Sequence, residues 1–399
     1  MNPAATLRST AEIRSRANHL LARARDGGSA WFTVHDDAMD TAAVEVAELT
    51  AARFPALDIP FHSRWRHFEA GGVDRKAELD RLLVDLDPAG RARAMIDLAV
   101  VSVLLDAGAG PDWTYRETDT GLQFSRSEGL GVASWHAFTA GVFSSDPARP
   151  LQADAAGLIG LDTAKLAGHL QLGPDNPLVG FEGRADLLRR LGAALAAQPA
   201  VFGIPGRPGG LFDLLVPAPT ADHLLGVLLA TLSGIWPAGN TIDGEPLGDC
   251  WPHPAVPGVG RTRGWMPFHK LSQWLTYSLL EPFGWAGAPV GGTEALTGLP
   301  EYRNGGLFLD TGVLALLDPG WAERGWTPAD ELVVEWRACT VALLDELAVL
   351  VRRRLGVTAD RLPLACVLEG GSWAAGRASA QRLRGGLPPL TVHSDGTVF

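Results

Sequence analysis

Apolar residues recur along most of this chain at intervals of three and four, the spacing of one face of a helix. The longest such run extends from Thr327 to Leu355 and predicts a central core helix. The same spacing predicts shorter helices at residues 9–25, 39–53, 74–87, 91–106, 183–198 and 221–233, and another that starts at residue 127. Alternation typical of strands appears at residues 114–125 and 390–399. The pattern therefore predicts a mainly α fold with short peripheral β-hairpins.

The first of these helices has a sequence signal at its beginning. Ser9 and Glu12 have the spacing of a capping box, in which each side chain bonds to the backbone N–H of the other residue. This pair predicts that the helix starts immediately after Ser9.

No stretch of low complexity divides the chain into domains. We expect a single large helical domain over residues 1–399, with an N-terminal helical part at 1–150 and a second part at 151–399 that carries the candidate catalytic pair. The long Gly- and Pro-rich connection at 234–267 is too rich in aromatic residues to be a plain linker. We interpret it as a structured loop with a functional role.

Amino-acid composition indicates a protein with a buried core and argues against nucleic-acid-binding and membrane-spanning classes. Hydrophobic residues make up 46% of the chain and there are 13 tryptophans, enough for a large buried core. Acidic residues outnumber basic ones 45 to 34, which argues against a nucleic-acid-binding protein, because phosphate recognition needs clustered Lys and Arg. The longest aliphatic stretch, residues 96–105, is interrupted by Asp97 and is too short to cross a membrane.

Cysteine usage and the N-terminus bear on location. Cys250, Cys339 and Cys366 are too few and too scattered for a disulfide framework. The first residues are charged and lack the apolar segment of a signal peptide. Together these features predict a cytoplasmic protein.

The strongest candidate chemistry lies at residues 267–312. Lys270 falls on a predicted amphipathic helix, and Glu301 follows Pro300 where a helix or turn should start. A buried carboxylate beside a cation can hold or transfer a proton near neutral pH, because burial raises its pKa and the cation lowers it. A structural ion pair between two helices explains the same residues equally well.

Two other segments combine polar groups in a way that suits a ligand. Residues 61–72 place Arg64, Arg66 and His67 ahead of paired glycines, which suits either an anion site or an arginine–aromatic scaffold. Residues 243–253 form a turn-rich loop whose carboxylates and imidazole suit sugar hydroxyl groups, or ordinary turns. Since neither segment has a recognised metal-ligand spacing, no metal site is predicted.

Common cofactor and nucleophile motifs do not occur. The glycine-rich stretch at 203–210 lacks the G-K-[ST] ending of a phosphate-binding loop and reads as a turn. No G-x-S-x-G motif is present, and the cysteines have no obvious activating base nearby in the sequence. We therefore predict no cofactor and no nucleophilic Ser or Cys.

Four longer motifs carry a resemblance to a known family: FHSRWRHFEAGG (61–72), DGEPLGDCWPH (243–253), PFHKLSQWLTYSLLEP (267–282) and LTGLPEYRNGGLFLDTGVL (296–314). Through them the whole chain resembles the uncharacterised family of the fungal-type uracil-catabolism protein four. The resemblance implies a role in the route that opens uracil nucleotides through ribosylurea-type intermediates.

A more remote resemblance covers about 50 residues. The Phe268–Gln273 segment and the Glu301-Tyr302-Arg303 turn look like the Lys-bearing helix and Asp-Tyr-Arg turn of queuosine-nucleotide N-glycosidases. Here Glu replaces Asp, and Asn-Gly-Gly follows where that family has an apolar-Pro-Gln run. The resemblance implies a helical fold similar to helix-hairpin-helix DNA glycosylases, with a Lys and a carboxylate serving N-glycosidic cleavage.

These lines lead to one hypothesis, a hydrolase that cleaves the N-glycosidic bond of a ribosylurea-type nucleoside or its 5′-phosphate. Glu301 is expected to stabilise the developing cation or activate water, and Lys270 to tune it. The residues expected to bind substrate are Arg303, Tyr302, Gln273, Arg64, Arg66, His67, Asp243, Asp249 and His253. We expect a small-molecule substrate and no nucleic-acid or membrane partner. An amidohydrolase acting on a ring-opened ureido group, or a non-catalytic protein of the same pathway, remains an alternative.

Overall fold

The computed structural model describes residues 2–106, 108–110 and 112–393, and most of them are helical. Their contacts separate into two compact units. Among the described residues, the first unit comprises 2–62, 240–273 and 293–393, and the second comprises 63–239 and 274–292. The predicted boundary near residue 150 lies inside the second unit, because each unit is assembled from segments far apart in the sequence.

The first unit contains both predicted catalytic residues. Its helices are α1 (Pro3–Leu7), α2 (Thr10–Arg25), α3 (Met39–Arg53), the start of α14 (Lys270–Trp285), α15 (Tyr302–Asp310), α16 (Glu331–Leu355), α17 (Leu364–Val367) and α18 (Trp373–Arg384). A π-helical turn, η7 (Leu368–Ser372), joins α17 to α18. Short 3₁₀ turns complete it: η1 (Asp36–Ala38), η4 (Gly260–Thr262), η5 (Thr293–Ala295) and η6 (Pro319–Glu323).

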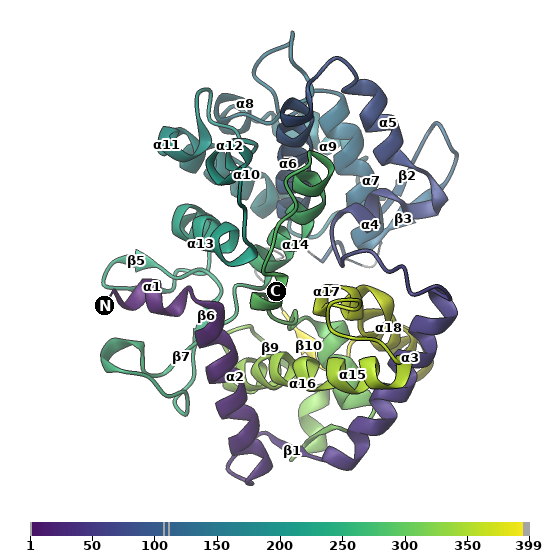
Figure 1. The fold of residues 1–399 in the computed structure, drawn as a ribbon, viewed down its shortest axis with the longest axis vertical. Helices are drawn as coiled ribbons and strands as arrows, with labels where there is room; N and C mark the ends of the chain where they lie inside the picture. Colours follow the sequence, from purple (N-terminus) through teal and green to yellow (C-terminus); the bar gives the residue numbers. More distant parts are fainter. Residues whose placement is uncertain (1, 107, 111, 394–399) are drawn as a thin grey trace. The chain divides into compact units, whose positions relative to one another are not determined.

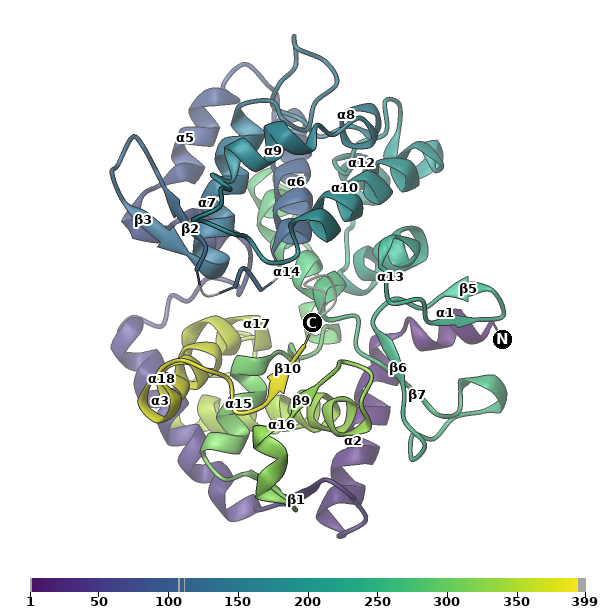
Figure 2. The same cartoon turned by 180° about the vertical axis from the view of Figure 1, so that it is seen from behind.

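Helix α16 is the centre of the first unit and packs against both α2 and α3 (Figure 1). Its C-terminus at Leu355 is as predicted, and Gly356 ends it in a left-handed conformation (φ 68°). The predicted start at Thr327 is wrong by four residues. The backbone N–H and hydroxyl of Thr327 both donate to Asp330 Oδ2, which forms a turn ahead of the helix. Helices α15 and α18 form a second packed pair (Figure 2).

The beginning of α2 agrees with the prediction, but its predicted cap does not form. Ser9 precedes the helix without a side-chain capping hydrogen bond, and Glu12 instead accepts from Arg16 Nε at 2.8 Å. The other end of the Arg16 guanidinium donates to three backbone carbonyls of the 257–265 segment. Glu12 therefore bonds to Arg16, which connects the helix to a distant segment, and the local capping box does not form.

Strands of the first unit form two-stranded sheets: β1 (Phe32–Val34) with β8 (Leu314–Leu316), β4 (Thr241–Ile242) with β5 (Glu245–Pro246), β6 (Cys250–Pro252) with β7 (Trp265–Pro267), and β9 (Gly325–Trp326) with β10 (Thr391–Val392). The predicted C-terminal hairpin is not formed by the described part of β10, which pairs in parallel with β9. Its predicted turn at residues 395–396 lies outside the described residues. The long 234–267 connection is ordered as β4 to β7, since Ile242, Leu247 and Cys250 pack against Ala4 and Leu7 of α1.

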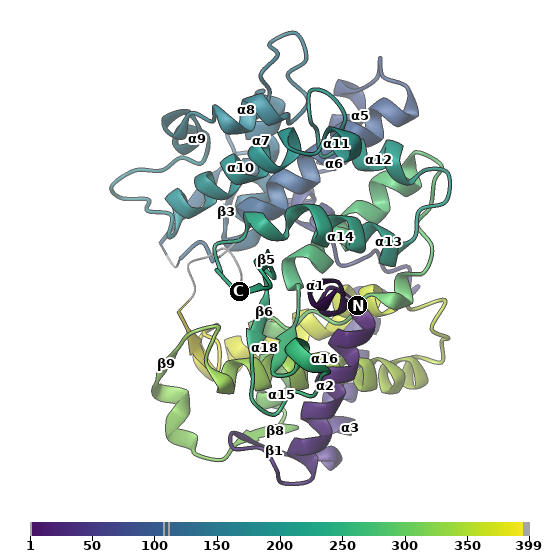
Figure 3. The same cartoon turned by 90° about the vertical axis from the view of Figure 1, so that its left-hand side faces the viewer.

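The second unit is also helical. It comprises α4 (Trp65–Phe68), α5 (Arg75–Leu82), α6 (Pro88–Leu105), α7 (Arg126–Thr139), α8 (Ala155–Ile159), α9 (Thr163–His169), α10 (Phe181–Ala196), α11 (Pro199–Phe202), α12 (Gly210–Leu215), α13 (Ala221–Leu232) and the rest of α14, with the 3₁₀ turns η2 (Ala70–Gly72) and η3 (Ser233–Ile235). Helices α8 and α10 are neighbours, as Figure 3 shows, and α6 packs on α7. Strands β2 (Thr114–Arg116) and β3 (Gln123–Ser125) form the predicted hairpin.

The mainly α fold with small peripheral sheets is thus confirmed, and helix ends differ from prediction by a few residues. Helix α6 starts at Pro88, earlier than predicted, because Asp87 caps it through Gly90 N–H and proline suits the first turn. Helix α5 ends earlier, at Leu82. Within the described ranges, no helix has the length and apolar character needed to cross a membrane. The resemblance to helix-hairpin-helix glycosylases stays a prediction.

Candidate active site

Glu301 occupies the cap position of helix α15. Its backbone is extended (φ −109°, ψ 169°), and its side chain turns back onto the first helical turn. Oε2 accepts the N–H of Arg303 at 2.7 Å, and Oε1 accepts the N–H of Asn304 at 2.6 Å. Two otherwise unpaired backbone donors and the positive end of the helix therefore hold one carboxylate in place.

Opposing influences act on the proton affinity of this carboxylate. Burial raises the pKa of Glu301, and it outweighs the lowering by the N–H groups of Arg303 and Asn304 and by the charges of Lys270 and His62. The net pKa is above the ordinary value of 4.5. A carboxyl group whose pKa is raised suits proton transfer, because its ionised form is a stronger base than an ordinary carboxylate.

Lys270 is positioned by a buried ion pair. It is the first residue of α14, and its N–H donates to Asp249 Oδ2 at 2.9 Å. Arg337 of α16 donates to both Asp249 oxygens at 2.8 Å, and Trp251 Nε1 donates to Oδ1 at 2.7 Å. Burial raises the pKa of Asp249, but the charge and hydrogen bonds of Arg337 outweigh it and the pKa is lowered. Asp249 is therefore an anion that fixes the start of α14.

The backbone just before Lys270 is unusual. His269 has a left-handed conformation (φ 48°), which is rare for a residue other than glycine. Its N–H and that of Phe268 both donate to the Asp249 carbonyl oxygen, and its Nε2 lies 2.9 Å from the Leu7 carbonyl oxygen. Strained backbone of this kind concentrates at functional sites, so it supports a role for the adjoining Lys270.

Three of the predicted substrate-binding residues, Gln273, Tyr302 and Arg303, lie in the same unit as Glu301 and Lys270. Gln273 is fully buried, and its amide bonds to Thr297 and to the Phe268 carbonyl, so it joins two segments of the fold. Arg303 is 2% exposed, yet among the described residues its guanidinium bonds to the Gly386 carbonyl at 3.3 Å and to no carboxylate. Its Nε is buried without a hydrogen-bond partner. A buried arginine without an anion suits an anionic ligand. Tyr302 lies beneath this guanidinium, with its ring centroid 4.5 Å from Cζ.

The three residues of the predicted sugar-binding loop do not face a common site. Asp243 lies on the exposed β4–β5 turn with φ 53° and pairs with Arg261. His253 directly follows β6 and is buried, with its Nε2 3.1 Å from Oε2 of Glu335 in α16. Asp249 supports Lys270. The three residues occupy separate surroundings, because the hairpin carries Asp243 outward while β6 runs into the core.

The remaining predicted residues belong to the second unit. Arg64 is completely buried and pairs with Asp106 Oδ2 at 3.0 Å, and it also lies 3.0 Å from His67 Nδ1. Burial lowers the pKa of Arg64, against the opposing effect of Asp106. Arg66 pairs with Glu281 at 2.6 Å and with Glu69 at 3.1 Å. Each arginine thus has a carboxylate of its own.

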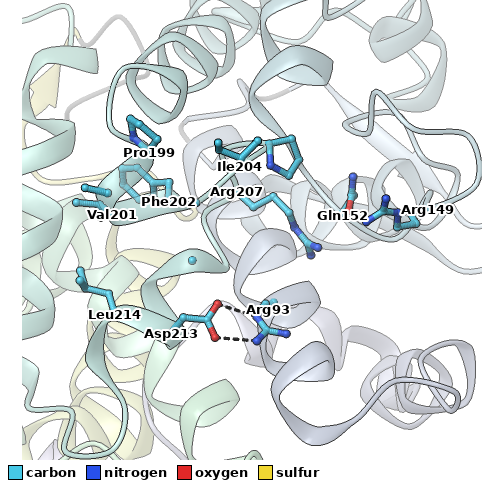
Figure 4. Close-up of a pocket in the computed structure, with 14 residues that line it drawn as sticks. Arg93, Arg149, Gln152, Pro199, Val201, Phe202, Ile204, Arg207, Asp213 and Leu214 are labelled. Atoms are coloured by element: carbon cyan, nitrogen blue, oxygen red, sulfur yellow. Dashed lines mark hydrogen bonds and ion pairs between the residues drawn. The ribbon is translucent and has the colours of Figure 1, made fainter.

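A pocket of about 520 Å³ also lies in the second unit (Figure 4). It is lined by the 203–210 turn, which includes Arg207, and by two further arginines, Arg93 and Arg149. Arg93 pairs with Asp213 at 2.7 Å, and Arg207 pairs with the buried Asp97 at 2.7 Å. Arg149 pairs with Asp146 at 3.0 Å. Because every guanidinium there already has a carboxylate, the pocket has no excess charge with which to select an anion.

Sequence patterns missed several residues near Glu301. Arg337 lies within the apolar pattern that predicted the long core helix, and its partner Asp249 is 88 residues away in the sequence, so no local signal marked the pair. His62 bonds to Glu369 across 307 residues. The π-helical turn η7 that carries Glu369 contains two adjacent glycines, Gly370 and Gly371, and this pair was the available signal for an irregular helix.

Comparison with known proteins identifies relatives over almost the whole chain. Residues 6–399 match the family described as "Protein of unknown function (DUF1688)". "Protein urg3" of Schizosaccharomyces pombe is 40% identical over 99% of this chain and 98% of its own length. "Uracil catabolism protein 4" of Lachancea kluyveri is 38% identical over 100% and 99%. These matches confirm the resemblance to uracil-catabolism protein four, whereas the similarity to queuosine-nucleotide N-glycosidases stays a prediction. The chain therefore belongs to the DUF1688 family and is related to urg3 and uracil catabolism protein 4 over nearly the whole of each chain.

Proposed function

We propose that this protein acts in uracil catabolism as a hydrolase, cleaving the N-glycosidic bond of a ribosylurea-type nucleoside or its 5′-phosphate. The relative named for uracil catabolism supports the pathway. The observation that carries the chemistry is the partly buried Glu301 carboxylate, held by two backbone N–H groups and influenced by the charge of Lys270.

Cleavage of a C1′–N bond builds positive charge at C1′ and needs water to attack there. Each oxygen of Glu301 accepts one backbone hydrogen bond, and a carboxylate oxygen has a second lone pair that can accept from water or face the developing cation. Because the N–H bonds prevent rotation of the carboxylate, little reorganisation is needed as charge develops. Glu301 takes the proton of the attacking water, and Lys270 favours its ionised form.

The test is an assay of purified protein with ribosylurea, its 5′-phosphate and a panel of nucleotides, following free urea and reducing sugar. The proposal requires stoichiometric release of urea and a ribose species from one of the first two substrates. Glu301→Gln should lower kcat by about 10²–10⁴-fold, the usual effect of losing a general base or an electrostatic stabiliser.

A matched control separates chemistry from helix capping. Asp162 also caps a helix, α9, where its Oδ1 accepts the N–H groups of Ala164 and Lys165. Asp162→Asn should keep wild-type kcat. If Glu301→Gln keeps full kcat and merely melts earlier, as the Asp162 variant does, Glu301 is a structural cap and the N-glycosidase proposal fails.

One observation favours the second candidate, an amidohydrolase that uses a metal ion. His253, Glu331 and Glu335 bring ligand atoms within 4.8 Å of one another. However, Arg23 Nη1 lies 3.2 Å from Glu335 Oε2, where its positive charge opposes a metal ion. His253 Nδ1 accepts the Ala255 N–H, so in a neutral ring the proton lies on Nε2 and faces Glu335. The residues therefore fit a metal poorly. Turnover abolished by chelation and restored by one divalent ion would favour the amidohydrolase.

A further inference from the structure

His62 is held at one nitrogen by a fixed carboxylate. Its Nδ1 lies 2.8 Å from Glu369 Oε2. Arg53, at the end of α3, pairs with the other Glu369 oxygen at 3.3 Å and donates through Nη1 to the carbonyl oxygens of Glu369 and Gly370. The Glu369 carboxylate therefore cannot swing away from the imidazole without breaking its bond to Arg53, whose guanidinium is itself held by the two backbone carbonyls.

This contact determines which ring nitrogen is available. An ionised carboxylate only accepts hydrogen bonds, so Nδ1 of His62 carries a proton toward Glu369. Nε2 has no hydrogen-bond partner among the described residues, and the side chain is 11% exposed. A histidine oriented at one nitrogen and open at the other is the arrangement used for acid–base catalysis.

The two other buried histidines among the described residues of the first unit differ in this respect. Both ring nitrogens of His253 are engaged, one by the Ala255 N–H and one by Glu335. The ring of His269 is buried, with Nε2 on the Leu7 carbonyl, and burial lowers its pKa. Both therefore fit structural roles, whereas His62 has a nitrogen left for a ligand.

The turn that carries Glu369 is fixed tightly in place. Glu369 belongs to the π-helical turn η7, a conformation that is rare and often found at functional sites. A Cβ atom at Gly371 would lie only 2.5 Å from the Val46 carbonyl oxygen of α3, so glycine is required at this approach. The close packing on α3 sets where Glu369 meets His62.

The same turn also reaches the cap that holds Glu301. Ser372, the last residue of η7, donates to Asn304 Oδ1 at 2.9 Å, and the N–H of Asn304 donates to Glu301 Oε1 at 2.6 Å. The charge of His62 in turn lowers the pKa of Glu301. One packed turn therefore connects the His62–Glu369 pair with the proposed catalytic carboxylate.

We propose that His62, oriented by Glu369, is the catalytic acid that protonates the departing nitrogen of the substrate. The inference rests on the function proposed above. His62 acts in its imidazolium form, which carries a proton on each ring nitrogen. Water forms a bond to C1′ and gives one proton to Glu301, while the C1′–N bond breaks and its electron pair takes the Nε2 proton, which leaves His62 neutral with its remaining proton on Nδ1. Urea and a ribose species result, and both side chains return to their starting states by exchanging protons with solvent.

The experiment compares two leaving groups on wild type and His62→Asn. Urea is a poor leaving group that needs a proton, whereas 4-nitrophenolate, released from 4-nitrophenyl β-D-ribofuranoside, leaves without one. With ribosylurea, His62→Asn should lower kcat by about 10²–10⁴-fold. With the nitrophenyl riboside the loss should be less than about fivefold, because the acid is not used. Glu369→Gln should show the same preference with a smaller loss, since Gln still accepts from Nδ1.

A control and the opposing outcomes complete the test. His136 forms a comparable pair with Glu117 at 2.7 Å in the second unit, and His136→Asn should leave the ratio of the two rates unchanged. If His62→Asn lowers both rates equally, or neither, His62 is not the acid, and the proposed function is unaffected. Failure of the wild-type protein to release urea would overturn both proposals. A thermal melt of each variant separates loss of folding from loss of the acid.

Discussion

Glu301 shows how one residue can serve the fold and the chemistry together. As a cap it accepts two backbone hydrogen bonds, and partial burial of its carboxylate raises its pKa. Lys270 moderates that shift from the start of α14, where Asp249 and Arg337 hold it. The pKa of Glu301 therefore depends on its own helix through the N–H groups of Arg303 and Asn304 and on the charges of Lys270 and His62 from two other segments.

Removing the charge of Lys270 should change the pH dependence of the rate. A base must be ionised, so kcat falls as pH drops through the pKa of Glu301. Since Lys270 lowers that pKa, Lys270→Met should move the acid limb of the kcat–pH profile to higher pH and lower kcat at neutral pH by about 10- to 100-fold. The double variant with Glu301→Gln should lose much less than the product of the single effects.

The control for this profile is Lys165→Met, which removes an exposed lysine of α9. Its profile should match wild type. An unchanged acid limb in Lys270→Met, or strictly multiplicative losses in the double variant, would contradict coupling between Lys270 and Glu301.

The three arginines predicted to bind the substrate differ in their partners. Arg64 and Arg66 have carboxylates, whereas Arg303 is buried with a single carbonyl contact among the described residues. We expect Arg303→Gln to raise KM for ribosylurea 5′-phosphate by about 10- to 100-fold, the value of a charge-assisted hydrogen bond, and to affect ribosylurea far less. Arg66→Gln provides the comparison. Equal changes in KM for both substrates would remove Arg303 from phosphate recognition.

At the level of elements, close helix packing positions the site. Helix α15, which begins after Glu301, packs on α18, and Gly376 of α18 faces the Arg303 backbone. A Cβ atom at Gly376 would overlap the Arg303 carbonyl oxygen and would lie 2.7 Å from the carbonyl carbon. Glycine therefore allows the two helices to approach, and the approach fixes the first turn of α15.

Gly376→Ala should accordingly force the two helices apart. We expect the free energy of unfolding to drop by about 1–3 kcal/mol, the usual effect of overpacking, and kcat to fall as the cap of α15 shifts. Gly226→Ala in α13 is the control, because nothing lies within 4 Å of the added Cβ, and it should stabilise by about 0.5–1 kcal/mol. Denaturant unfolding measures both. A neutral Gly376→Ala variant would mean that the helices can separate without cost.

For the whole molecule, buried ion pairs make stability depend on pH. Burial of Glu117 raises its pKa, but hydrogen bonds from Arg75, Thr120 and His136 outweigh burial and lower the pKa from 4.5 to about 2. A carboxyl group with a depressed pKa stabilises the fold above its ordinary pKa. That contribution is lost as pH falls from about 4.5 toward about 2, because the unfolded chain then binds the proton more readily.

Glu117→Gln should therefore be destabilised near neutral pH and should lose less stability than wild type between pH 4.5 and 2. Urea unfolding midpoints at several pH values measure the two slopes. Glu182→Gln removes the same charge at an exposed position and should follow wild type. Parallel wild-type and Glu117→Gln curves would show that Glu117 titrates alike in the folded and unfolded chain.

The sequence by itself determined the mainly α class, the bounds of α3, the C-terminus of α16 and the β2–β3 hairpin, because helical periodicity and turn residues act between near neighbours. It also indicated that a helix or turn starts at Glu301. Tertiary structure alone decided the partners: Asp249 with Arg337, His62 with Glu369, and Arg16 with a distant loop instead of a local cap. Such pairings depend on which segments pack together, and the energy of a buried charge depends on that packing more than on its neighbours in sequence.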